Sequence, residues 1–411
     1  MRNFRKKYQV EQAVILCGGF GTRLSKITIK TPKPLIKFNK IIFLDYVIKN
    51  LLRYGIKEVV LLCYYKSEHF IKRYHNKEIF PGITIKCVVE KKALGTFGSI
   101  KNAQKELKDF FLLLNGDTYF DINYRDIIIS YNYKKFLGII ALTKKNRNQF
   151  SKILLNKKGV IEKFHNDKKN SVINSGVYIF SKKICKIKSN EYSSLEKEIL
   201  PKLVKQKKIQ GKKYVKKHNK FIDIGTPKDY VKAEEFLSNV IRKKAVFLDR
   251  DGVLNEDLGY VHKIKDFMWK KDVIKAVKFL NDNNYYVFIV TNQGGVGLGY
   301  FKEAAIKNLY RWMVFKLNEK GAHIDDLFYS TYHPNSKKKF TNKEKNLRKP
   351  NTGMLEVAFN KWNILIKGSL VIGDNQTDIM MAQKADINSY LVKKKINLLT
   401  VVKKFHKEKL L

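Results

Sequence analysis

The apolar run Ala245–Leu248 is followed directly by two carboxylates two positions apart, Asp249 and Asp251. A strand of this kind would deliver both side chains to one edge of a sheet. One carboxylate can then attack a phosphorus atom while its neighbour transfers the proton of the leaving alcohol. Because the pattern Asp-x-Asp is common on protein surfaces, this interpretation depends on further elements in the sequence.

Three such elements follow in the order that this chemistry requires. Thr291-Asn292-Gln293 comes after an expected strand, Arg348-Lys349-Pro350 lies in an expected loop, and Gly373-Asp374, with Asp378 shortly after, follows another expected strand. Hydroxyl, amide and cationic side chains can bind a phosphoryl group, and carboxylate oxygens suit Mg²⁺. The set predicts phosphoryl chemistry in the second half of the chain.

The first half carries a glycine-rich turn after the apolar run Ala13–Cys17. The turn reads Gly18-Gly19-Phe20-Gly21-Thr22-Arg23-Leu24, and Pro32-Lys33-Pro34-Leu35 follows it. Glycines directly after a strand let backbone N–H groups approach phosphate oxygens, while Arg23 and Lys33 add positive charge. The dinucleotide pattern GxGxxG fails because Leu24 takes the place of its third glycine, and no GK[ST] completes a P-loop.

These segments resemble the sugar-phosphate nucleotidyltransferases, whose signature GGxGTRL followed by PKPL is reproduced in order and spacing. The resemblance covers roughly residues 11–240 and implies that a sugar 1-phosphate oxygen attacks the α-phosphorus of a nucleoside triphosphate and expels pyrophosphate. Its other pieces are Glu90 with Leu94-Gly95-Thr96, Leu114–Thr118, Asn174–Val177 and Phe221–Pro227.

The same resemblance implies roles for individual residues. Arg23 and Lys33 would be catalytic, and Asp117 and Asp223 would hold Mg²⁺. The nucleotide would be bound by Gly18, Gly19, Gly21 and Thr22, and the sugar would be faced by Glu90, Gly95 and Gly176.

The lysine that binds the sugar phosphate is less clearly marked. Many relatives carry a Glu-Lys pair after a Phe, whereas here Phe164 is followed by His165-Asn166-Asp167-Lys168. Lys168 and Lys163 are both candidates for this role, and either could instead be a solvated loop lysine.

The second half resembles the haloacid dehalogenase phosphatases, and more narrowly the heptose bisphosphate phosphatases and their histidinol-phosphatase relatives over roughly residues 243–395. The segments that carry this resemblance are DRDGVLNEDLGYV, TNQGGVGLGYF and RKPNTGML. It implies that Asp249 becomes the aspartyl-phosphate and that Asp251 is the general acid and base. Thr291, Asn292, Arg348 and Lys349 would bind the phosphate and sugar. Mg²⁺ would lie between Asp249, the Asp251 carbonyl and Asp374, and Asp378 would buttress the site.

One departure from that family concerns zinc. Relatives often hold a structural zinc through CPHH and CxC segments, but the corresponding stretches here are Ser330–Pro334 and Lys345–Leu347. All the expected sulfur ligands are replaced, so we expect no zinc and read His333 as a loop histidine. The loop would then be ordered by packing.

Apolar runs of strand length alternate with amphipathic stretches in both halves, which predicts parallel strands joined by crossover helices. The expected strands are Ala13–Cys17, Val59–Cys63, Ile83–Val89, Phe110–Leu114, Gly138–Leu142, Gly176–Phe180, Ala245–Leu248, Tyr286–Val290, Leu327–Ser330 and Ser369–Ile372. The expected helices are Phe43–Tyr54, Asp229–Ile241, Val273–Asn281, Lys302–Lys320 and Thr352–Trp362.

The fold class is therefore α/β, with two doubly wound domains, 1–241 and 242–411. The first would be a Rossmann-like nucleotidyltransferase sheet and the second a HAD-like Rossmannoid sheet. The short stretch after Asn255 leaves room for only a minimal cap, so substrate selection falls to the loops Asn255–His262 and Gly294–Phe301.

Composition limits the classes of function. The 411 residues are 44% hydrophobic, which excludes a wholly disordered chain. The formal charge of +46 invites a nucleic-acid interpretation, but the lysines are spread over both halves, so we expect no dedicated nucleic-acid partner. The 4 cysteines lie in apolar surroundings without a CxxC pair. No apolar run reaches membrane-spanning length, so we expect no membrane partner and a cytoplasmic protein.

Together the halves predict a bifunctional enzyme of nucleotide-activated heptose biosynthesis that uses Mg²⁺ in both domains. The phosphatase would make heptose 1-phosphate from the 1,7-bisphosphate, and the transferase would activate it, with GTP as the expected donor. Three alternatives stay open: a fusion for another sugar 1-phosphate, a histidinol-phosphate phosphatase joined to a transferase, and a basic scaffold or nucleic-acid binder with degenerate domains.

Overall fold

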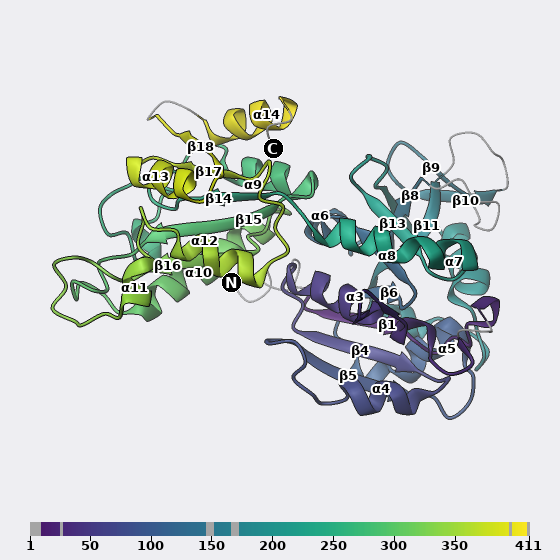
Figure 1. Ribbon diagram of the computed structural model, residues 1–411. Helices are drawn as coiled ribbons and strands as arrows, with labels where there is room; N and C mark the ends of the chain where they lie inside the picture. Colours follow the sequence, from purple (N-terminus) through teal and green to yellow (C-terminus); the bar gives the residue numbers. More distant parts are fainter. Residues whose placement is uncertain (1–9, 25–27, 145–151, 166–171, 394–396, 409–411) are drawn as a thin grey trace. The chain divides into compact units, whose positions relative to one another are not determined.

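The computed structural model describes residues 10–24, 28–144, 152–165, 172–393 and 397–408. The chain divides into two compact units, Met1–Val240 and Ile241–Leu411, each of which is an α/β layer structure (Figure 1). The helix α8 (Pro227–Ile241) ends where the second unit begins. No helix among the described residues is long and apolar enough to cross a membrane.

The first unit is built on one mixed sheet of nine strands within the described residues. The strands are β1 (Gln12–Leu16), β4 (Glu58–Cys63), β5 (Thr84–Val89), β6 (Phe110–Asn115), β8 (Gly138–Thr143), β9 (Lys152–Leu155), β10 (Ile161–His165), β11 (Val172–Ser181) and β12 (Ile209–Lys213). Two small ladders accompany it, β2 (Lys37–Phe38) with β3 (Ile41–Ile42), and β7 (Thr118–Asp121) with β13 (Lys220–Asp223).

The helical segments of the first unit are α3 (Phe43–Leu52), α4 (Ser67–Tyr74), α5 (Gly95–Asn102), α6 (Tyr124–Ser130), α7 (Leu200–Lys205) and the short turns η2 (Thr22–Leu24), η3 (Lys33–Leu35), η4 (Gln104–Glu106), η5 (Lys182–Lys186) and η6 (Leu195–Ile199). One sheet face is covered by α5, η6 and α7, whose Phe97, Leu195 and Leu203 are fully buried against Val14 and Tyr178.

The order of the strands indicates where a ligand site of the first unit would lie. The strands β5, β4, β1 and β6 lie side by side and parallel, and the chain crosses from β5 back to the far side of β1 to form β6. In open α/β sheets, ligands bind where the strand order reverses in this way, at the carboxyl ends of the strands. Here that point lies between the end of β1, with its glycine turn, and the end of β6, with Asp117.

The expectation of parallel strands throughout the first half is wrong for β11. This strand runs antiparallel to β6, β8 and β9. The strands β9 and β10 form an antiparallel hairpin, and β11 pairs with the other side of β9, again antiparallel. The sheet is therefore mixed, although each expected strand of this half is present.

The second unit holds a parallel five-stranded sheet in the order β16-β15-β14-β17-β18 within the described residues. Its strands are β14 (Ala245–Leu248), β15 (Tyr286–Asn292), β16 (Asp326–Ser330), β17 (Leu370–Gly373) and β18 (Asn388–Leu391). Its helical segments are η7 (Ile264–Asp266), α9 (Val273–Asp282), α10 (Glu303–Asn318), α11 (Asn342–Asn346), α12 (Gly353–Lys361), α13 (Gln376–Lys384) and α14 (Leu398–Lys407).

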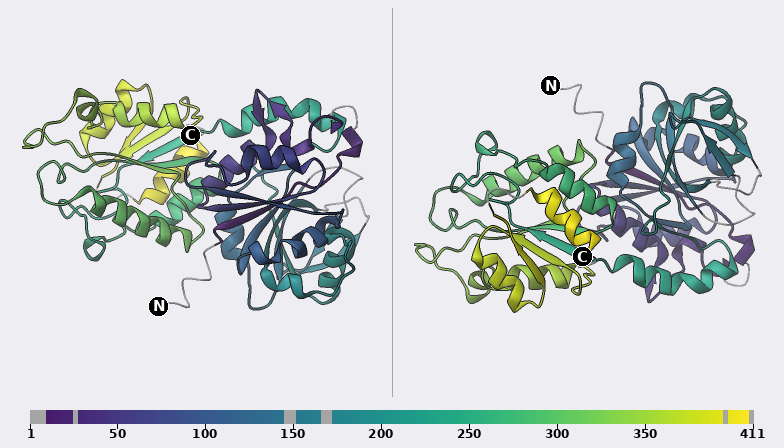
Figure 2. Two further views of the ribbon diagram at one scale, coloured as in Figure 1. Left: turned by 90° about the horizontal axis from the view of Figure 1, so that it is seen from below. Right: turned by 90° about the horizontal axis from the view of Figure 1, so that it is seen from above.

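Alternating side chains of β14 explain why helices cover both faces of this sheet (Figure 2). Val246 and Leu248 pack with α9, α10 and α14, whereas Ala245 and Phe247 pack with α12 and α13. All four side chains are fully buried, as expected for a central strand of a doubly wound sheet. Between β14 and α9 only the turn η7 occurs, so no cap domain is inserted there.

Candidate active sites

A cavity of about 310 Å³ opens at the reversal point of the first sheet. Its wall contains residues expected from the sequence, namely Gly18, Gly19, Gly21, Lys33, Glu90, Gly95 and Asp117. The glycine turn leaves β1 at one side, and α5 begins at another. The fold thus gathers into one cavity residues that are about 100 positions apart in the chain.

Lys33 and Asp117 form an ion pair in this cavity. The Lys33 ammonium lies 3.0 Å from Oδ2 of Asp117, and the Lys33 side chain is nearly buried. Burial without a partner would be costly for a cation, so the carboxylate holds the lysine in place. A bound triphosphate would offer the same ammonium new anionic partners.

The ladder of β7 and β13 brings Asp117 and Asp223 to a common end. Thr118 pairs with Asp223, and the Ile224 N–H donates to the Asp117 carbonyl at 3.0 Å. Asp223 is buried and accepts a hydrogen bond of 2.7 Å from the Gly225 N–H. These two carboxylates, 106 positions apart, therefore come from adjacent backbone positions.

Glu90 follows β5 and lies beside the glycine turn. A Cβ atom on Gly18 would be only 3.6 Å from Oε1 of Glu90. The Glu90 carboxylate accepts hydrogen bonds from Ser99 Oγ at 2.5 Å and from the Leu94 N–H at 3.0 Å. Burial raises the pKa of Glu90, and these two hydrogen bonds partly oppose the rise.

Sequence reasoning missed part of the cavity wall, which includes Tyr192 and Glu196. The segment before η6 reaches the cavity because Gly95 has a φ of +74° and a Cβ atom there would lie 2.6 Å from the Ser193 carbonyl oxygen. Only glycine allows this close approach. No short sequence motif marks Tyr192 or Glu196. The one available signal is that Glu196 is a polar residue at the start of the amphipathic turn η6.

Besides Asp223, five predicted residues of the first unit lie outside the cavity wall or outside the described side chains. One of them, Thr22, is exposed in η2. Lys168 lies outside the described residues, and for Arg23 the structure describes the backbone, in η2, but not the side chain. Lys163 is exposed on β10. Gly176 does not line the cavity but packs against Asn115, which does.

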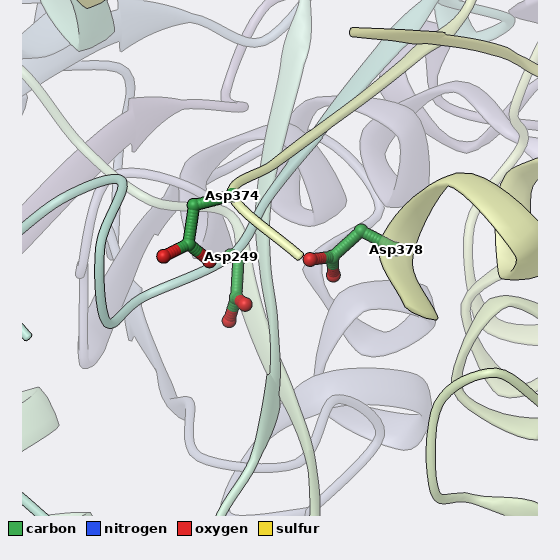
Figure 3. Close-up of side chains that lie close together, drawn as sticks. All are labelled: Asp249, Asp374 and Asp378. Atoms are coloured by element: carbon green, nitrogen blue, oxygen red, sulfur yellow. The ribbon is translucent and has the colours of Figure 1, made fainter. Parts of the chain in front are cut away.

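In the second unit, three carboxylates meet at the carboxyl ends of the neighbouring strands β14 and β17. Asp249, Asp374 and Asp378 place one oxygen each within 4.8 Å of the others (Figure 3). Gly252, with a φ of +77°, makes room for them, because a Cβ atom there would lie 1.8 Å from Oδ2 of Asp374. The glycine of the DxDG segment is therefore required by the site.

Lys349 binds two of these carboxylates. Its ammonium lies 2.7 Å from Oδ2 of Asp249 and 2.6 Å from Oδ1 of Asp378, and the lysine side chain is 2% exposed. Burial, together with Asp378 and Asp251, raises the pKa of Asp249 to about 7 despite the lysine. Burial disfavours the charged lysine, but the two carboxylates outweigh it and raise the pKa of Lys349.

Asp251 is held by side chains from three directions. The Arg250 guanidinium contacts both carboxylate oxygens, at 2.9 and 2.7 Å, and Arg250 is itself buried. Asn255 donates to Oδ1 at 2.9 Å, and Gln293 donates to Oδ2 at 3.1 Å. The carboxylate expected to transfer protons is thus fixed in orientation close to Asp249.

Asn292 anchors the loop that carries Lys349. Its side chain accepts from the Lys349 N–H at 3.0 Å and donates to the Lys349 carbonyl at 3.3 Å. The buried Thr291 accepts from Gln293 at 3.0 Å. Arg348 donates to the Tyr332 carbonyl at 2.9 Å. Through these two hydrogen bonds, Asn292 holds the backbone of Lys349 in place.

The two loops expected to select the substrate pack against each other. Tyr260 and Tyr300 meet edge to face with ring centroids 4.9 Å apart. His262 and Phe301 stack with centroids 4.4 Å apart. Aromatic pairs of this kind stabilise loop packing by about 1 kcal/mol each.

The loop that holds zinc in many phosphatases is built from other contacts here. Ser330 is buried at the end of β16, Lys345 is exposed in α11, and the His333 ring accepts a hydrogen bond from the Asn335 N–H at 3.1 Å. The helix α11 begins with a reciprocal capping box between Thr341 and Glu344.

The donor set of the second site suits Mg²⁺, which prefers carboxylate and carbonyl oxygens. Asp378 already uses Oδ1 for Lys349 and accepts from the Asn375 N–H through Oδ2 at 3.2 Å, and it is fully buried. Asp374 is exposed at the same point. Asp249 also has both oxygens engaged, Oδ1 by the Arg250 N–H at 2.7 Å and Oδ2 by Lys349, so Asp374 is the most accessible of the three carboxylates. A carboxylate oxygen that accepts one hydrogen bond still has a lone pair for a cation, so Asp249 can join Asp374, while the fully buried Asp378 positions Lys349.

Comparison with known proteins gives the family of each unit. Residues 12–240 match the family model of the nucleotidyl transferases, and residues 346–408 match a HAD-hydrolase-like model. The D-glycero-alpha-D-manno-heptose 1-phosphate guanylyltransferase of Campylobacter jejuni is 37% identical over 53% of this chain and 96% of its own length.

Two further proteins are similar to parts of this chain. The D-glycero-alpha-D-manno-heptose-1,7-bisphosphate 7-phosphatase of Photorhabdus laumondii is 39% identical over 36% of this chain and 82% of its own length. The crystal structure of HddC from Yersinia pseudotuberculosis has a TM-score of 0.48 and 30% identity, covering 55% of this chain and 98% of that one. The chain belongs to the nucleotidyl transferase family and, through its second catalytic unit, to the family of the heptose bisphosphate phosphatases.

Proposed function

We propose that this chain catalyses two consecutive reactions of nucleotide-activated heptose biosynthesis. The second unit removes the 7-phosphate from D-glycero-α-D-manno-heptose 1,7-bisphosphate. The first unit transfers GMP from GTP to the heptose 1-phosphate that results, and pyrophosphate leaves. One observation carries the proposal: the chain matches most of the length of a named heptose 1-phosphate guanylyltransferase and of a named heptose bisphosphatase, and the product of the second is the acceptor of the first.

In the phosphatase reaction, an Asp249 oxygen attacks the phosphorus and the bond to the sugar oxygen breaks. Asp251, held by Arg250, Asn255 and Gln293, gives its proton to the leaving alkoxide. Asp251 then takes a proton from the water that attacks the aspartyl-phosphate, which releases inorganic phosphate and restores Asp249. Lys349 balances negative charge beside the nucleophile.

In the transferase reaction, an oxygen of the sugar 1-phosphate attacks the α-phosphorus, and the bond to the pyrophosphate oxygen breaks. The chain's contribution is to position two anionic reactants and to neutralise the charge that develops. The backbone of Gly18 to Thr22 and the Lys33 ammonium would bind the triphosphate.

Mg²⁺ would be held by Asp117 and Asp223 in the first unit, and by Asp249, the Asp251 carbonyl and Asp374 in the second. There it would supply positive charge that lets anionic groups approach phosphate oxygens. The close backbone positions of Asp117 and Asp223, and the three meeting carboxylates of the second unit, support this assignment.

The test is direct. Purified protein is incubated with heptose 1,7-bisphosphate, Mg²⁺ and one nucleoside triphosphate at a time, and the products are identified by mass. We expect inorganic phosphate, heptose 1-phosphate and, with GTP, GDP-heptose. Phosphate release without any nucleotide sugar, or a nucleotide sugar formed only from hexose 1-phosphates, would contradict the proposal.

A further inference from the structure

One wall of the cavity in the first unit is formed by η6, a single π-helical turn, and by the start of α5. π-helical turns are uncommon and often lie at functional sites. The turn carries Glu196 into the cavity wall, and the Leu195 N–H donates to Thr96 Oγ1 at 2.8 Å. This bond ties the turn to α5, so the position of Glu196 is fixed by the fold.

The Glu196 carboxylate is oriented by two hydroxyl groups. Thr96 Oγ1 donates to Oε2 at 2.8 Å, and the Tyr178 hydroxyl donates to Oε1 at 3.4 Å. The Tyr178 hydroxyl in turn accepts from Asn174 Nδ2 at 2.6 Å. An ionised carboxylate has about four acceptor positions, so each oxygen can accept a further hydrogen bond from a ligand. Sugar hydroxyls are donors of the required kind.

The charge of the cavity wall is unfavourable to additional anions. Its acidic residues are Glu90, Asp117 and Glu196, and the cation among the lining side chains that the structure describes is Lys33, which is already paired with Asp117. Within the described parts of the chain, Glu196 forms no ion pair. A phosphate dianion that entered beside the half-buried Glu196 would meet a like charge.

We propose that Glu196 selects the acceptor, because its carboxylate accepts hydrogen bonds from sugar hydroxyls and repels a second phosphate group on the same sugar. This inference rests on the proposed function and deepens it. It makes the order of the two reactions obligatory: the 7-phosphate must be removed in the second unit before the first unit can use the sugar. Glu196 is thus a specificity residue that the transferase sequence motifs do not mark.

The test uses the full chain with Asp249→Asn, so that the 7-phosphate survives the assay. Transfer from GTP in the presence of Mg²⁺ is measured with heptose 1-phosphate and with heptose 1,7-bisphosphate, and products are identified by mass. Glu196→Gln, which removes the charge at constant shape, is compared with Glu196→Asp, which keeps the charge. Glu191→Gln is the matched control, since Glu191 is exposed nearby and does not line the cavity.

We expect the parent to prefer the monophosphate by about 100-fold or more in kcat/KM, and Glu196→Gln to reduce this ratio by about tenfold, with a higher KM for the monophosphate. Glu196→Asp should keep the preference, and Glu191→Gln should change nothing. If Glu196→Gln kept the parent's ratio of kcat/KM for the monophosphate to kcat/KM for the bisphosphate, the inference about Glu196 would be overturned, while the proposed function would stand. Failure of the parent to use heptose 1-phosphate at all would overturn the proposed function, and the inference with it.

Discussion

The ammonium of Lys349 lies 2.7 Å from Oδ2 of Asp249, although the two residues are 100 positions apart in the chain. Both side chains are nearly buried, and Lys349 holds Asp378 on its other side at 2.6 Å. The proposed nucleophile of the phosphatase therefore lies in a site where one cation serves two carboxylates. This excess of negative charge leads to specific expectations for mutants, metal and pH.

Asp249→Asn should abolish phosphate release and leave the transferase intact. An amide cannot form the aspartyl-phosphate, so we expect phosphate release to fall at least about 10³-fold. Transfer to supplied heptose 1-phosphate should stay within about twofold, because Asp249 belongs to the second unit. Asp386→Asn, an exposed carboxylate in the same unit, is the control. Equal loss of both activities in a folded protein would contradict the assignment.

The converse variants are Asp117→Asn and Asp223→Asn. Each removes a proposed Mg²⁺ ligand of the first unit, so formation of the nucleotide sugar should fall about 100-fold or more, while phosphate release persists. Pyrophosphate release and inorganic phosphate release, measured on the same samples, separate the two activities. Transfer at the parent rate in both variants would rule out the proposed metal site.

Replacing Lys349 should destabilise the second unit. Lys349→Met leaves Asp249 and Asp378 buried without their shared cation, and breaking a buried pair in this way costs about 3–5 kcal/mol. Lys345→Met, at an exposed lysine of α11, should have little effect. Thermal unfolding of both variants without metal would show the difference, and equal melting temperatures would argue against a structural role for the ion pair.

Mg²⁺ and pH should act together on stability. Burial raises the pKa of Asp249 from its usual value near 3.8 to about 7 in the metal-free chain. The folded state therefore holds a proton between about pH 4 and 7 that the unfolded state has lost, and this group lowers stability as pH rises through that range. Mg²⁺ should relieve the repulsion, so it should raise the melting temperature more at pH 8 than at pH 5.5.

The control for this experiment is Asp249→Asn, which removes the titrating group. The difference in melting temperature between parent and variant, measured at both pH values with and without Mg²⁺, isolates the contribution of Asp249 from that of other carboxylates. A Mg²⁺ effect that is the same at both pH values in the parent would show that the proton and the cation do not compete at this site.

The sequence was sufficient to predict most strands of both sheets, because central strands are continuous apolar runs. The expected Ala245–Leu248 coincides with β14, and Asp249 follows it as predicted. The sheet strands that escaped prediction are β9, β10, β12 and β18, of which β10, β12 and β18 are edge strands and β9 is the neighbour of one. β12 reads IQGKK and β18 reads NSYL, so neither carries a recognisable apolar pattern. Edge strands are half solvated, and the charge or polarity that protects them also hides them.

The sequence predicted candidate site residues that lie in short motifs. It did not predict those whose position depends on packing between distant segments. Asp249, Asp251, Lys349 and Asp374 lie in recognisable segments. Glu196 reaches its cavity because Gly95 permits contact with Ser193, a relationship across 98 positions that no local pattern contains. The hydrogen bonds that anchor Lys349 to Asn292 also depend on two separate segments. Such contacts follow from the three-dimensional arrangement of the strands.

The final prediction concerns the nucleotide. The family resemblance implies that Glu90 faces the sugar, but Glu90 also lies beside Gly18 of the glycine turn, and its buried carboxylate keeps acceptor positions beyond those used by Ser99 and Leu94. Guanine presents an amino donor that adenine, cytosine and uracil do not present at the same position, so a fixed acceptor on the turn side of the cavity would favour GTP. We expect kcat/KM with heptose 1-phosphate to be at least about tenfold higher for GTP than for ATP, CTP or UTP. Glu90→Gln should raise the KM for GTP and narrow this preference, with little change in the KM for heptose 1-phosphate. If Glu90→Gln instead raises the KM for the sugar and leaves the preference for GTP unchanged, Glu90 faces the sugar and another part of the turn recognises the base.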